Sequence, residues 1–401
     1  MACLARFATL TVPRGTLRPH SLSPRSDLRQ DVTWASAVLL FLVWAPLYQL
    51  DPNRVTQGPL VYFFQLLATQ TFPTLSLVAG LVLAVVLPVD YRSSLVFLVA
   101  LLLGILPALV WPTFAEPAQS ARVAPALGFW LLEGALVCRL LLGQVCKTRL
   151  NVFFWGLAAV IFGVLIAVGD FGALSFVKEA ASDPQRILDE LGQHLALTFW
   201  PVGFAVVLGF PLGVVAFKAR WGKSLIQWAS VIQTVPSIAL FGLLMIPLAA
   251  LTRSFPWLKD WGVAGIGAFP VEISLTLWAL LPVLSGIHAG LAMVPPEVVR
   301  SAKGLGFSSR EIFWQVELPL AIPSVLAGFR VAVVQTVGNA TLAPLIGGGG
   351  LGWFIFQGIG QTSSDMVILG VLLVLFVTVV LDQLLKGLVT LSHRGVAHVN
   401  S

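Results

Sequence analysis

The chain has 401 residues, of which 57% are hydrophobic and 10% are charged, and its formal net charge is +6. Because an ordinary soluble domain carries about 25% charged residues, this composition excludes a soluble globular protein and indicates a protein embedded in lipid. The basic residues are dispersed among apolar runs instead of clustering on one face, which excludes nucleic acid as a partner and is typical of membrane topology.

The first half begins with residues 1–33, which contain five arginines but no compact apolar run that ends in a cleavage site. They predict a disordered cytoplasmic tail, or an over-long translated start that is absent from the mature chain. Since about 20 apolar residues cross a membrane, five further runs predict an accessory membrane region of five spans, residues 34–175. These runs lie at about 34–50, 72–89, 94–112, 124–143 and 151–170.

A more polar stretch, residues 176–194, separates the two halves and predicts an amphipathic connector helix on the extracytoplasmic membrane surface. The second half predicts a membrane core of five spans over residues 195–392, followed by a tail at 393–401. Its apolar runs lie near 195–217, 225–251, 268–293, 321–345 and 366–389. We therefore expect an all-α fold, a polytopic transmembrane helical bundle of about ten spans.

Lysine and arginine are enriched in short cytoplasmic loops. With both termini in the cytoplasm, the basic residues of this chain favour the inner segments over the outer ones by roughly three to one. The pattern predicts a multi-pass protein whose two termini are both cytoplasmic.

Residues 295–320 interrupt the second half with a segment that is too polar to cross lipid cheaply. It contains six charged residues together with an apolar stripe that includes Val298, Leu305 and Ile312. The pattern predicts a short helix, a turn over residues 304–309, and a second helix that Pro319 stops. One face would contact another protein; the alternative is a plain surface loop between two spans.

Polar residues also occur inside two of the predicted spans, where an unsatisfied polar group costs several kcal/mol and so tends to face protein or water. They are candidates for a translocation pathway, and hydrogen bonding between spans is the equally weighted alternative. The candidates are Gln233, Thr234, Pro236, Ser237, Thr336, Asn339 and Thr341.

Four consecutive glycines, Gly347, Gly348, Gly349 and Gly350, cannot remain helical without a large entropy cost. They predict an outer-face loop or a re-entrant turn, which is either an outer gate or a flexible connection.

Isolated ionisable residues carry less information. Glu133 lies within a predicted span and suggests a structural ion pair or a transport role, whereas Arg330 is expected to reach the inner interface with its long side chain. His194 and His288 are isolated, and the three cysteines show no metal-ligand spacing. We expect no catalytic set, no metal and no cofactor.

The segment at 295–320 resembles the cytoplasmic loop of binding-protein-dependent ABC importer permeases. That pattern reads Glu-Ala-Ala, three residues, Gly, nine residues, Ile-x-Leu-Pro, and the matching positions here are Ser301, Ala302, Gly306, Val316, Leu318 and Pro319. Arg300 stands where the family usually has Glu, and Ser301 replaces the first Ala.

Two further segments, residues 233–240 and 336–352, look like the permeases for glycine betaine, carnitine and choline. The resemblance covers about residues 190–392. The sequence Asp-Pro-Asn-Arg at 51–54 and the extra amino-terminal spans suggest the longer subgroup of that family.

The resemblance implies a five-helix type I ABC importer permease core in the plasma (inner) membrane of a prokaryote, importing a quaternary ammonium osmolyte. It implies that ATP is hydrolysed on separate ABC ATPase subunits, and that an extracytoplasmic solute-binding protein and a second permease chain are further partners besides membrane lipid. The residues implied in coupling to the ATPase are Arg300, Ser301, Ala302, Lys303, Gly306, Val316, Leu318 and Pro319.

The alternative function is a stand-alone ion-coupled secondary transporter, which would need intramembrane carboxylates or an inverted repeat with broken helices. A membrane-embedded enzyme is a weaker rival, because no catalytic set is clustered in the sequence. Which solute is carried, whether the paired permease is identical, and what the first five spans do are left open.

Overall fold

The computed structural model describes residues 44–52, 58–65, 122–132, 134 and 174–399, with side chains to residue 392. The chain divides into two compact units, Met1–Leu174 and Ser175–Ser401. Among the described residues, the strands lie in the first unit and the long helices lie in the second.

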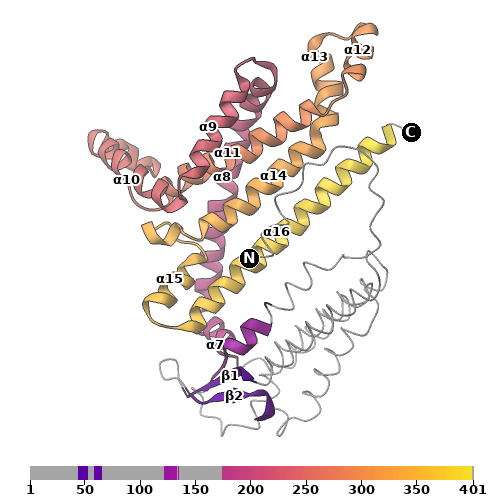
Figure 1. Cartoon of the computed structure of the whole chain (residues 1–401). Helices are drawn as coiled ribbons and strands as arrows, with labels where there is room; N and C mark the ends of the chain where they lie inside the picture. The colour runs from indigo at the N-terminus through magenta and orange to yellow at the C-terminus, as the bar shows by residue number, and fades with distance from the viewer. Residues whose placement is uncertain (1–43, 53–57, 66–121, 133, 135–173, 400–401) are drawn as a thin grey trace, which may run out of the picture. The chain divides into compact units, whose positions relative to one another are not determined.

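The described part of the first unit contains a three-stranded antiparallel sheet in the order β2-β1-β3 (Figure 1). The strands are β1 (Pro46–Asp51), β2 (Leu60–Tyr62) and β3 (Arg122–Pro125). Tyr48 pairs with Val61 on one side and with Pro125 on the other. The Asp51 carboxylate accepts the N–H of Gly58 at 2.8 Å, which ties the connection between β1 and β2 to the end of β1.

This sheet contradicts two expectations. The chain is not exclusively helical, and residues 46–50 are strand where the first span was predicted. Pro46 cannot donate a helical hydrogen bond, and β1 gains backbone partners on both edges instead. Most of the other predicted spans of the first half, and Glu133, lie outside the described residues.

The second unit is helical. Its long helices are α8 (Pro184–Lys218), α9 (Gly222–Thr234), α10 (Ser237–Ser254), α11 (Ala268–Ala292), α14 (Leu318–Ala340) and α16 (Ser364–Val399). The shorter elements are α7 (Ser175–Ser182), η3 (Pro256–Trp261), α12 (Pro296–Gly304), α13 (Ser309–Ile312), η4 (Phe313–Glu317), η5 (Ala343–Ile346) and α15 (Gly352–Gly360).

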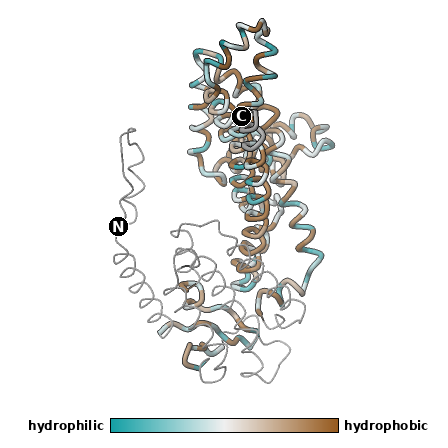
Figure 2. The backbone as a smooth tube through the Cα atoms, turned by 90° about the vertical axis from the view of Figure 1, so that its right-hand side faces the viewer, coloured by the Kyte–Doolittle hydropathy of each residue, from teal (hydrophilic) through white to brown (hydrophobic). Residues whose placement is uncertain are grey.

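Five helical stretches among the described residues are long and apolar enough to cross a membrane. They are Pro184–Lys218, Ser237–Ser254, Ala268–Ala292, Ser309–Ala340 and Ser364–Ser392. The five spans predicted for the second half are thus confirmed in number, with different boundaries. Figure 2 shows mostly hydrophobic residues along these helices and a mixture of hydrophilic and hydrophobic ones at the top, where Figure 1 places α12 and α13.

Small residues hold the centre of this unit together. A Cβ added to Gly209 or Gly213 of α8 would come within 2.8 Å of Val283 or Ile287 on α11, so only glycine permits this approach. Gly286 of α11 meets Gly328 of α14 in the same way. Close backbone approach through small residues is how helices associate in lipid.

The second predicted span, 225–251, is broken into α9 and α10 at Val235 and Pro236. Val235 is extended (φ −74°, ψ 125°), because the ring of the following proline disfavours the helical region. The structure therefore has a complete helix break where the sequence predicted one continuous span.

The predicted separation of a surface helix, 176–194, from a span beginning at 195 is also wrong. A short α7 ends at Ser182, and α8 then runs without interruption from Pro184 to Lys218. The Asp183 carboxylate caps α8 by accepting the N–H of Arg186 at 3.0 Å, and proline is favourable in a first helical turn. The chain stays helical across residues 194 and 195, so the polar residues before them form the first turns of a long helix.

Pro319 does not stop the second helix of the 295–320 segment. Helical structure continues from α13 through the π turn η4 into α14, which ends at Ala340, whereas the sequence predicted its end near 345. The N–H of Leu318 donates to the carbonyl of Phe313, five residues back. This wide turn precedes Pro319, which therefore lies in the first turn of α14, where a missing N–H is tolerated.

Candidate functional site

Two features of the second unit lie at opposite ends of the bundle (Figure 1). One is the 295–320 segment, which contains α12 and α13. The other is the glycine loop, residues 347–350, between η5 and α15.

The 295–320 segment folds as a compact helix-turn-helix. Ser308 and Glu311 form a capping box, in which the Ser308 N–H donates to the Glu311 carboxylate at 2.7 Å and the Glu311 N–H donates to the Ser308 hydroxyl at 3.3 Å. Gly306 makes the turn with φ +89°, a left-handed conformation that favours glycine. Ala302 and Ile312 are buried, so the segment has its own small core.

The outer surface of this segment is apolar and basic. Leu305 and Trp314 are 78% and 54% exposed, and Val298 and Phe307 are also exposed. The basic residues Arg300, Lys303 and Arg310 are exposed around them. An exposed apolar patch bordered by charge is typical of a protein-binding surface.

The structure places the eight predicted coupling residues unequally. Ala302 is buried, whereas Val316 and Leu318 are half-buried. The exposed members are Arg300, Ser301, Lys303, Gly306 and Pro319. Arg300, at the position where the family usually has Glu, pairs with Glu297 one turn earlier in α12 at 3.0 Å.

The π turn η4 contacts the end of α8. The Lys218 ammonium lies 3.8 Å from the Glu317 carboxylate and 4.5 Å from the centroid of the Phe313 ring. The Lys218 side chain is about half exposed, so this pair contributes at most about 1 kcal/mol to stability. Its significance is positional, because it joins the 295–320 segment to a helix 35 residues long.

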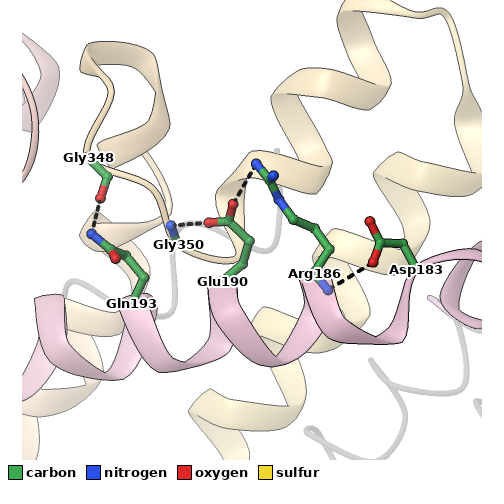
Figure 3. A network of polar contacts seen from close by, with 6 residues as sticks. All are labelled: Asp183, Arg186, Glu190, Gln193, Gly348 and Gly350. Carbon is green, nitrogen blue, oxygen red and sulfur yellow. Dashed lines mark hydrogen bonds and ion pairs between the residues drawn. The ribbon is translucent and has the colours of Figure 1, made fainter.

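The glycine loop is held by α8 at the opposite end. Gly347, Gly349 and Gly350 have φ of +79°, +70° and +96°, which side chains other than glycine rarely adopt. The Gln193 amide donates to the Gly348 carbonyl at 2.9 Å, and the Gly350 N–H donates to the Glu190 carboxylate at 2.6 Å (Figure 3). The loop therefore has a defined conformation.

Glu190 is the centre of this network (Figure 3). It is 8% exposed, and its second carboxylate oxygen pairs with Arg186 at 3.0 Å. The Arg186 guanidinium in turn lies 4.1 Å from the centroid of the Trp353 ring on α15. A buried carboxylate needs such partners, since desolvation otherwise costs several kcal/mol.

Four residues of this network were not predicted from the sequence: Arg186, Glu190, Gln193 and Trp353. A usable signal was present, because Arg186, Glu190 and Gln193 have the spacing i, i+4, i+7 that places them on one helical face. Assigning residues 176–194 to a separate surface helix concealed their connection to the membrane core.

The predicted pathway residues have mixed environments. The Gln233 amide donates to the Trp278 carbonyl on α11 at 2.8 Å, as expected for hydrogen bonding between spans. The hydroxyls of Thr234, Thr336 and Thr341 donate to carbonyls of their own helices. Thr336 is 1% exposed and Ser237 is buried, whereas Thr234 is exposed and Asn339 is half-buried. Pro236 is exposed at the break between α9 and α10.

In the part of the chain that the structure describes, no hydrogen bond or ion pair joins the pathway candidates at residues 233–237 to those at residues 336–341. Within the same described ranges, no group of three or more His, Cys, Asp or Glu side chains is placed to hold a metal ion.

Arg330 of α14 forms a two-pronged ion pair with Asp382 of α16, at 2.7 Å and 2.9 Å. From the sequence, its side chain was expected to reach the inner interface. A guanidinium within a span is costly when unpaired, and α16 supplies a carboxylate beside it.

Comparison with known proteins matches residues 205–398 to a family described as binding-protein-dependent transport system inner membrane component. The chain is 37% identical over 210 residues to the osmoprotectant import permease protein OsmW of Salmonella typhimurium, covering 51% of this chain and 91% of that protein. It is 32% identical over 201 residues to the glycine betaine/carnitine/choline transport system permease protein OpuCB of Bacillus subtilis, covering 50% and 85%. A solved structure of the inward-facing MetNI methionine ABC transporter aligns with a TM-score of 0.45 at 21% identity, covering 53% of this chain and 98% of that chain.

Proposed function

We propose that this chain imports a quaternary ammonium osmolyte such as glycine betaine, choline or carnitine. The chain belongs to the family of binding-protein-dependent transport system inner membrane components and is the permease subunit of an ABC importer. The protein is a multi-pass inner membrane protein, and ATP is hydrolysed by separate chains. The named substrates of OpuCB and the osmoprotectant role in the name of OsmW support this assignment, since the chain spans most of both proteins.

The 295–320 segment is the surface that binds the ATPase, and it faces the cytosol. Its capping box and its buried Ala302 and Ile312 support this role, because a packed element transmits movement and a loose loop does not. The exposed Leu305, Phe307 and Trp314 supply the apolar contact area. The eight predicted coupling residues lie on or within this element.

The translocation pathway runs along α9 and α14. Three polar side chains of α9, Gln227, Ser230 and Thr234, are exposed on one face, which supports a polar lining on that side of the helix. We assign Thr234 and Asn339 to the pathway lining. The remaining candidates, Gln233, Pro236, Ser237, Thr336 and Thr341, set the shape of the helices that form it.

The glycine loop is the outer gate. Its defined conformation and its attachment to α8 support a gate over a flexible connection. The complete importer then contains two ATPase subunits, a second permease chain and an extracytoplasmic solute-binding protein that docks near this loop. The amino-terminal half contributes accessory spans in front of the five-span core, and both termini are cytoplasmic.

The helix-turn-helix at 295–320 is the observation that carries this proposal, and deletion of residues 306–317 tests it. The deleted chain should insert into the membrane but fail to co-purify with its ATPase subunit. ATP-dependent uptake of radiolabelled glycine betaine, choline and carnitine by the assembled complex tests the substrate class. Normal ATPase binding by the deleted chain would refute the coupling role, and absence of uptake of all three solutes by the intact complex would refute the substrate assignment.

A further inference from the structure

We propose that α8 is the rigid link through which movement of the 295–320 segment reaches the glycine loop, with Lys218 as the positioning residue at one end and Glu190 at the other. The inference rests on the proposed coupling and gating roles of those two elements.

The first end of the link is the contact of Lys218 with η4. Lys218 pairs with Glu317 and lies over the face of Phe313, which are the last and first residues of the π turn. Glu317 is the more buried partner, with a side chain 16% exposed. A displacement of this turn therefore changes two contacts of the same ammonium group.

The π turn itself supplies the discrete change that a switch needs. A π turn holds one residue more than an α turn, so conversion to α would rotate α13 against α14 by about 100°. Phe313 and Glu317 could not both keep their contacts with Lys218 through that rotation. The segment is in the π arrangement in the structure, and both contacts of Lys218 favour that arrangement over the α one.

The second end of the link is the attachment of the glycine loop. Gly350 and Gly348 are hydrogen-bonded to Glu190 and Gln193, which lie one turn apart on α8. Arg186 completes this end by pairing with Glu190 and covering Trp353 of α15. Movement of the first turns of α8 must either carry the loop along or break these bonds.

The two ends belong to one uninterrupted helix. Glu190 and Lys218 are separated by about 42 Å at 1.5 Å per residue. The half of this length nearer Lys218 is fixed on α11, because Gly209 and Gly213 leave no room between the two helices. A helix supported in this way moves as a unit with α11 instead of bending freely, even though Pro201 and Pro211 lie within it.

The test measures the response of the loop to ATP without any solute. The complex with its ATPase subunits is reconstituted with spin labels at Leu345→Cys and Leu384→Cys, two exposed positions on η5 beside the glycine loop and on α16, after replacement of the native cysteines. Lys218→Met and Glu317→Gln should each reduce the ATP-induced change in the population of label distances by about two- to fivefold. The double variant should lose no more than the greater single loss, because both changes remove the same contact.

Lys223→Met is the matched control, since it removes a nearby exposed lysine at the start of α9. It should leave the distance change intact. The exchanged pair Lys218→Glu with Glu317→Lys should restore most of the response, which separates a specific contact from general damage to folding. An unchanged response in the double variant, or an equal loss in Lys223→Met, would overturn the proposal.

The result does not depend on the substrate. If the complex imports no quaternary ammonium solute but the variants still lose the ATP response, the substrate assignment fails and the link stands. If solute import is normal and the variants respond to ATP as the wild type does, the link fails and the proposed function stands.

Discussion

The carboxylate of Glu190 accepts the backbone N–H of Gly350 at 2.6 Å, across 160 residues of sequence. The same carboxylate is buried and paired with Arg186, so the hydrogen bond to the loop is charge-assisted and shielded from water. The start of the first core helix thereby fixes a loop that would otherwise be among the most mobile parts of the chain.

Glu190→Ala should lower both stability and uptake. It leaves the Gly350 N–H without its acceptor, at a cost of about 1–3 kcal/mol, and it frees Arg186. Glu190→Gln keeps an oxygen for Gly350 but loses the ion pair, so its effect should be intermediate. Thermal unfolding in detergent and solute uptake by vesicles measure the two effects. Equal stability of the wild type and Glu190→Ala would contradict the buried role of this carboxylate.

Gly350→Ala should be destabilising by about 1–3 kcal/mol, because a side chain is strained at φ +96°. The added Cβ would also lie 3.1 Å from Nδ1 of His194. Gly192→Ala is the control on the neighbouring helix, where a Cβ meets nothing within 4 Å and alanine should be neutral or stabilising by up to about 1 kcal/mol. Thermal unfolding of both variants measures the difference, and a similar effect of the two would argue against backbone strain.

Thr234→Val and Gln233→Leu should separate pathway from packing. Thr234 is exposed, so Thr234→Val should impair uptake with little change in melting temperature. Gln233→Leu removes the hydrogen bond to Trp278 and should cost about 0.6 kcal/mol of stability, with a smaller effect on uptake. Uptake rates and unfolding temperatures of both variants, compared at equal expression, give the answer. The opposite pattern would assign Gln233 to the pathway.

Leu305→Asp should weaken binding of the ATPase subunit by at least about tenfold while leaving the fold intact. The residue is 78% exposed, so the change disturbs no internal packing and places a charge on the apolar patch. Trp261→Asp is the control, since it introduces the same charge at an 80% exposed position outside the 295–320 segment. Co-purification and titration of the ATPase measure the effect, and undiminished binding by Leu305→Asp would remove this patch from the interface.

Arg330→Met should destabilise the packing of α14 against α16, because it leaves Asp382 without its partner within a span. Since both side chains are partly exposed, we expect a loss of about 1–2 kcal/mol. Adding Asp382→Leu should recover most of it, as the double variant has no unpaired charge. Unfolding in detergent measures the stability of both variants. A double variant less stable than Arg330→Met would contradict the prediction.

Much of the core could be read from the sequence, because lipid imposes a simple rule on it. A span must be long, apolar and helical, so the five core crossings were predicted in number. The helix-turn-helix at 295–320 was equally visible, since Gly306 and the Ser308 cap are local signals. The boundaries at residues 194, 235 and 319 were wrong, because continuity of a helix past a polar stretch or a proline depends on its neighbours.

The site was predictable only in part. The glycine loop was identified, but the residues that hold it were not, because a run of glycines contains no information on its partners. Gln233 illustrates the same limit: its polarity within a span was plain, yet whether the amide faces a pathway or Trp278 depends on where α11 lies.

The amino-acid sequence alone determined the class of protein, the number of core spans and the position of the helix-turn-helix at 295–320, because hydrophobic length and turn chemistry act within short stretches of chain. Only the tertiary structure decided that Glu190 meets Gly350, that Lys218 meets Glu317 and that Arg330 meets Asp382. These pairs arise from the packing of helices through Gly209, Gly213, Gly286 and Gly328, and such packing depends on the shapes of surfaces that are distant in sequence.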